Sequence, residues 1–103
     1  MSGGTRRSVL TRIMEIETQV KNMVLDDKFN RVKDNIRILK DTSFFGDIRV
    51  HNPNNIDSMI EVRRNSVKSR QCLEIYEKMA HEYEERINNL NNEKKKLQTE
   101  LFR

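Results

Sequence analysis

Apolar residues recur along the first third of the chain at the spacing of one helical face. Residues 5–40 contain neither glycine nor proline, and steps of four and three positions place side chains on one stripe of an α-helix. The sequence therefore predicts a first amphipathic helix over residues 5–40, preceded by a flexible segment at residues 1–4. The stripe consists of Val9, Ile13, Ile16, Val20 and Met23.

This stripe changes face near two adjacent aspartates, Asp26 and Asp27. The second set of apolar residues has the same spacing but starts two positions out of step: Leu25, Phe29, Val32, Ile36 and Leu39. A continuous helix with a rotating seam and a break near Asp26 both explain the shift. We favour the continuous helix, because aspartate is a mediocre helix former but not a helix breaker. The second patch is then a candidate docking surface, formed by Phe29, Val32 and Ile36.

Residues 41–57 differ in kind, because they concentrate glycine, proline, asparagine, serine and threonine. These residues favour turns, so we predict a 17-residue connecting loop. Phe44 and Phe45 either cover the end of a helix pair or belong to a docking element, in which residues 47–51 add as a short strand to a partner.

A second helix is predicted over residues 58–103. Ser58 and Glu61 have the spacing of a capping box, and a heptad pattern continues from there to the end of the chain, which favours a coiled coil. The face is broad near Cys72 and narrows after Tyr83, as expected for a bundle that continues as a simpler coiled coil. The proposed oligomer interface consists of Met59, Val62, Leu73, Tyr76, Ala80, Tyr83, Ile87, Leu90, Leu97 and Leu101.

The predicted fold is therefore all-α: two long helices joined by a long loop, assembled into an oligomeric helical bundle. The second helix would exceed the first by roughly 20 Å at about 1.5 Å per residue, so another chain must cover it. A homo-oligomer, as a dimer or higher, is favoured over a hetero-coiled coil. Strand number and helix orientation stay open, although the positions flanking the seam lack the opposite charges that would favour a parallel homodimer.

Composition argues against an enzyme. Charged residues make up 35% of the chain and aromatic residues 6%, which is little material for a catalytic core. His51 and His81 are not placed to pair with Cys72, and we expect no catalytic residues, no metal site and no cofactor. A single cysteine and the lack of a long apolar run indicate an intracellular protein without membrane insertion.

The function predicted from these patterns is a non-enzymatic coiled-coil oligomerisation or scaffold subunit of an intracellular multiprotein assembly in the cytoplasm, cytoskeleton or nucleus. The net charge of +4 leaves a basic helical nucleic-acid-binding protein as the alternative. Ser8 and Ser66 follow paired arginines, so both are candidate phosphorylation sites.

The order of a long helix containing residues 16–20, a loop, and a helix with arginine and tyrosine resembles helical dimerisation subunits of histone-deacetylase corepressors. It is similarly close to small kinetochore and spindle-pole coiled-coil subunits. Neither resemblance rests on a specific motif, so neither implies a functional residue. The heptad pattern runs to Leu101 without a cap, so a segment of a longer protein and a complete chain both stay open.

Overall fold

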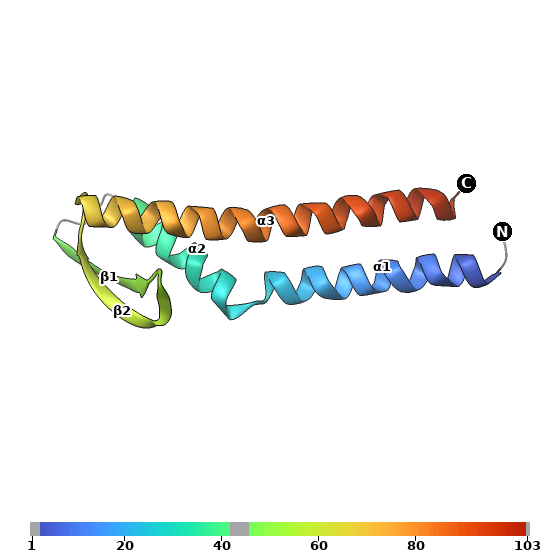
Figure 1. The fold of residues 1–103 in the computed structure, drawn as a ribbon, viewed down its shortest axis with the longest axis horizontal. Helices are drawn as coiled ribbons and strands as arrows, with labels where there is room; N and C mark the ends of the chain where they lie inside the picture. Colours follow the sequence, from blue (N-terminus) through green and yellow to red (C-terminus); the bar gives the residue numbers. More distant parts are fainter. Residues whose placement is uncertain (1–2, 42–45, 103) are drawn as a thin grey trace. The chain divides into compact units, whose positions relative to one another are not determined.

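The computed structural model describes residues 3–41 and 46–102, with side chains from Arg6 onward. In these segments the chain forms three α-helices and one β-hairpin (Figure 1). The elements are α1 (Gly3–Val24), α2 (Asp27–Lys40), β1 (Asp47–Asn52), β2 (Asn55–Arg63) and α3 (Val67–Leu101). The prediction of an all-α fold is therefore wrong, because the chain also forms an antiparallel two-stranded sheet, which follows α2 and precedes α3 in the sequence. The predicted coiled-coil bundle is not confirmed.

The chain divides into two compact units. The helix-pair unit comprises Met1–Leu25 and Tyr83–Arg103, and therefore holds α1 and the C-terminal half of α3. The hairpin unit comprises Asp26–Glu82, and holds α2, both strands and the N-terminal half of α3. Since α1 starts at Gly3, its first residues belong to the segment expected to be flexible.

The first predicted helix is broken between α1 and α2, so the preference for a continuous helix is wrong. Asp26 is the N-cap of α2, with an extended backbone (φ −59°, ψ 124°), and its carboxylate accepts a hydrogen bond of 2.9 Å from the Lys28 amide. An aspartate in this position satisfies a backbone N–H that the helix leaves unpaired. The two offset apolar stripes therefore belong to two separate helices.

The hairpin occupies most of the predicted loop and the first six residues of the predicted second helix, residues 58–63. Its strands pair from Asp47 opposite Arg63 to His51 opposite Met59, and the turn contains Pro53 and Asn54. The Asn54 amide donates to the Asn52 side chain at 2.9 Å, as expected for an asparagine-stabilised turn. Near this turn the register shifts, and Asn52 faces Asn55.

Residues 58–63 lie in β2, so the capping box predicted at Ser58 is wrong. The half-buried and buried positions of β2 alternate with exposed ones, and three of these inward residues are β-branched: Ile56, Ile60 and Val62. Met59 and Val62 also match a helical spacing, and this ambiguity explains the error. Met59 and Val62 are also part of the predicted oligomer interface, but they lie in β2, and the helix that carries the other residues of that interface begins at Val67.

The cap of α3 is Ser66, eight residues beyond the predicted one. The Ser69 amide donates to Ser66 Oγ at 3.1 Å, and Ser69 Oγ donates to the Ser66 carbonyl at 2.8 Å. The preceding residue, Asn65, has a positive φ of 62°, a conformation that asparagine tolerates better than most residues. This turn connects β2 to α3.

The core of the hairpin unit is assembled from α2, both strands and α3. Its buried apolar side chains are Phe29, Val32, Val50, Val62, Cys72, Tyr76 and Ala80. The polar side chains of Asn35 and Ser69 are buried with them. Each element thus contributes to a single core, which explains why a two-stranded sheet, marginal by itself, is held in place.

Candidate interaction surfaces

The helix-pair unit packs α1 against the C-terminal half of α3, and the two helices run in opposite directions (Figure 1). Ile13 and Ile16 of α1 are buried. The predicted interface residues on the facing helix are only half-buried: Tyr83, Ile87, Leu90, Leu97 and Leu101. Because one helix covers only part of a neighbouring stripe, this apolar seam remains partly open to solvent.

Two polar contacts align the helices of this unit. Arg12 forms a two-pronged contact with Glu93, with Nη2–Oε2 at 2.8 Å and Nε–Oε1 at 3.3 Å. The hydrogen bond to Glu93 raises the pKa of the Arg12 guanidinium. Lys94, which interrupts the heptad pattern, places its Nζ 4.0 Å from Glu17 Oε1. These contacts fix which residues of α1 and α3 face each other.

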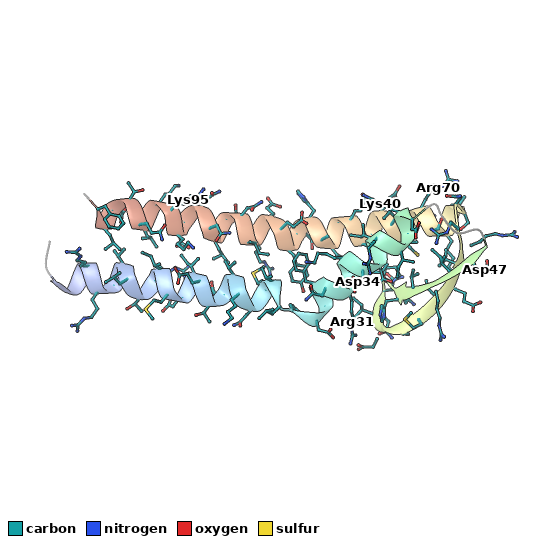
Figure 2. All side chains as sticks on the ribbon, turned by 180° about the vertical axis from the view of Figure 1, so that it is seen from behind. Arg31, Asp34, Lys40, Asp47, Arg70 and Lys95 are labelled. Atoms are coloured by element: carbon teal, nitrogen blue, oxygen red, sulfur yellow. The ribbon has the colours of Figure 1, made fainter. Side chains whose placement is uncertain are left out.

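A second apolar feature of α1 is turned away from this seam. Leu10 and Met14 are four residues apart and share one face, and they are 47% and 67% exposed. We call these two residues the α1 strip. On α3, by contrast, Lys95 and Lys96 are exposed, and Figure 2 shows Lys95 pointing away from α1. The α1 strip and these lysines therefore lie on different helices.

The hairpin unit holds a buried polar cluster that the sequence did not predict. The His51 amide of β1 donates to Asn35 Oδ1 of α2 at 2.9 Å, and the Tyr76 hydroxyl of α3 donates to the His51 carbonyl. Burial raises the pKa of Tyr76 to about 12, with a smaller contribution from Cys72. Two side chains thereby satisfy the amide and the carbonyl of His51 on the side of β1 away from β2.

The predicted docking patch is part of this core. Phe29 and Val32 are buried and Ile36 is half-buried, so their own chain covers most of their surface. Phe44 and Phe45 lie outside the described residues. Residues 47–51 do form a strand, but it pairs with β2 of the same chain. Leu73 is half-buried, and Tyr76 and Ala80 are buried in the same unit.

Two shallow pockets lie in the hairpin unit, and each is lined by one charged side chain. One of about 310 Å³ is lined by Leu39, Asn65, Ser69, Arg70 and Leu73, and one of about 250 Å³ lies between the turn of the hairpin and α3. Arg70 is the charged group in the first, and Lys68 lies beside Cys72 in the second. Burial raises the pKa of the Cys72 thiol, although Lys68 acts in the opposite direction, so burial favours the neutral thiol.

The two candidate phosphorylation sites have different environments. Ser8 is exposed on α1, whereas Ser66 is half-buried and its hydroxyl caps α3. A phosphate on Ser66 would alter the hydroxyl that accepts from the Ser69 amide, although negative charge at a helix N-terminus is favourable. Modification of either residue stays a prediction.

No protein-family model, curated protein or solved structure matches this chain. In the described parts of the chain, no three metal-binding side chains gather closely enough to hold an ion. Within the same residues, no helix has the length and apolar character needed to cross a membrane. The function is therefore proposed from the exposed and half-buried surfaces of the two units.

Proposed function

We propose that this chain is a non-enzymatic oligomerisation and scaffold subunit of an intracellular multiprotein assembly. It associates with a second copy through the open seam and the α1 strip of the helix-pair unit. The observation that carries this proposal is the incomplete burial of apolar side chains in that unit. Only Ile13 and Ile16 are fully buried among its described residues, while Leu10 and Met14 stay exposed.

Energetics favour covering this surface. Full burial of a leucine or methionine side chain contributes about 1.5–3 kcal/mol, and helices in water depend on the packing of their apolar face for most of their stability. A second helix pair laid on the first would bury the α1 strip and the half-exposed seam together. The resulting four-helix arrangement uses surfaces that a lone helix pair leaves in water.

The test replaces the α1 strip. We expect Leu10→Glu combined with Met14→Glu to shift the purified protein toward the mass of a single chain in size-exclusion chromatography with light scattering. Both side chains are exposed within one chain, so the change should leave its fold intact, which circular dichroism can verify.

The matched control is Thr11→Glu combined with Gln19→Glu, two exposed positions on the same helix. It adds the same charge without removing apolar surface, and it should retain the mass of the unaltered protein. An unaltered protein that already runs as a single chain, or identical masses for both variants, would contradict the proposed function.

A further inference from the structure

The two outer edges of the β-hairpin differ at the pair formed by His51 and Met59. At His51, the outward edge of β1 is closed, because Asn35 accepts from its amide and Tyr76 donates to its carbonyl. Across the hairpin from His51 lies Met59 of β2. An unpaired strand edge can bind another strand through its free N–H and C=O groups. The hairpin can therefore add a strand only if the outer edge of β2 is unpaired.

The hydrogen-bond alternation of the hairpin shows which groups of β2 point outward. In an antiparallel ladder, every second pair of residues exchanges hydrogen bonds, and the remaining pairs direct their N–H and C=O groups away. The N–H and C=O groups of His51 bond to Asn35 and Tyr76 on the side away from β2. His51 and Met59 are therefore a pair that exchanges no backbone hydrogen bonds. The bond from the Arg64 amide to the Gly46 carbonyl, 2.9 Å long, fits this alternation.

It follows that Met59 and Glu61 direct their backbone groups away from β1. In the part of the chain that the structure describes, no hydrogen bond joins these groups to another residue. The side chains of Met59, Glu61 and Arg63 are exposed as well. The nine residues of β2 contain no proline and no glycine, so nothing in the strand prevents further pairing.

We propose that this edge binds β2 of a second copy of the chain, antiparallel and around a two-fold axis at Ile60, to form a continuous four-stranded sheet. Met59 then lies opposite Glu61 of the second copy, and each such pair exchanges both backbone hydrogen bonds. This contact goes beyond the proposed function, because it lies in the hairpin unit and not on the helix pair.

Charge selects this register and this partner. With Ile60 on the axis, Asp57 lies opposite Arg63 of the second copy, and the symmetry produces this opposite-charge pair twice. A shift of two residues in one direction sets Asp57 against Glu61, and a shift in the other sets Glu61 against Glu61. Directly opposed like charges destabilise antiparallel strands. The register with Ile60 on the axis therefore pairs opposite charges, whereas the two registers shifted by two residues oppose like charges.

Cysteine trapping tests this geometry. Cys72 is the single cysteine, so Cys72→Ser provides a background without thiols in which Ile60→Cys, Met59→Cys and Glu61→Cys are compared. Facing residues at the axis have Cα atoms about 4.5 Å apart, within disulfide range, whereas two copies of residue 59 would be roughly 8–9 Å apart.

The expected result is a disulfide-linked dimer for Ile60→Cys under mild oxidation, and monomers for the two neighbouring variants. A dimer formed by Met59→Cys or Glu61→Cys instead would overturn the register, and monomers in all three cases would overturn the contact. This result tests the β2 contact in the hairpin unit alone. The variant Leu10→Glu with Met14→Glu tests the α1 strip in the helix-pair unit, so the two proposals can fail separately.

A charge exchange on the chain with its natural cysteine provides a second test that does not depend on the Cys72→Ser background. Arg63→Asp alone should weaken self-association in sedimentation equilibrium by about tenfold, because it converts two attractions into repulsions. Asp57→Arg should weaken self-association as well, but it also removes the contact of 3.5 Å between Asp57 Oδ1 and Arg31 Nη1 of the same chain. The double variant restores the pairs in reverse and should return to within about threefold of the original. Single variants without effect, or a double variant weaker than both, would overturn the proposal.

Discussion

At the scale of residues, the cluster of Asn35, His51 and Tyr76 explains how helices hold a two-stranded sheet. The Asn35 and Tyr76 side chains are buried and bond to the same backbone residue of β1. A buried backbone group that loses its partner costs about 1–3 kcal/mol. The cluster is therefore the main polar link of β1 to α2 and α3.

The first prediction concerns Tyr76→Phe, which keeps the ring and removes the hydroxyl. We expect a loss of about 1–3 kcal/mol in the free energy of unfolding, measured by chemical denaturation at pH 7. Asn88→Ala, at an exposed position of α3, is the control and should change stability by less than about 0.5 kcal/mol. A Tyr76→Phe protein as stable as the original would show that this bond is not important.

The raised pKa of Tyr76 also predicts a pH dependence. The unfolded chain loses this proton near pH 10 and the folded chain near pH 12, so the folded state binds the proton more tightly. The contribution is complete below pH 10 and is lost as pH rises from 10 to about 12. Denaturation curves should show this decline, and Tyr76→Phe should lack it; an equal decline in both proteins would contradict the assignment.

At the scale of elements, the sequence predicted what depends on local periodicity. The stripe from Val9 to Met23 does identify α1, and its central residues Ile13 and Ile16 are buried. The same reasoning failed where two patterns overlap, since Met59 and Val62 fit both a helix and a strand. It could not predict the contacts of Asn35, because they depend on a strand sixteen residues away.

The N-terminus of α2 is capped by the side chain of Asp26. Asp26→Ala should cost about 0.5–2 kcal/mol of unfolding free energy, while Asp26→Asn keeps an acceptor for the Lys28 amide and should cost much less. Thermal melts followed by circular dichroism compare them. Asp34→Ala, an exposed aspartate of α2, should be nearly neutral, and equal effects at both positions would contradict the capping role.

At the scale of the whole molecule, the chain holds a helix pair and a β-hairpin, and each has a surface that one copy leaves uncovered. The helix pair exposes the α1 strip, and the hairpin exposes the edge of β2. Self-association is therefore the central claim.

The most direct measurement is sedimentation equilibrium of the purified chain over about a hundredfold range of concentration. We expect a mass above the 12.3 kDa of one chain, which rises with concentration to a whole-number multiple of that mass. Circular dichroism should show a folded protein at every concentration. A folded protein that stays at 12.3 kDa at every concentration would contradict self-association.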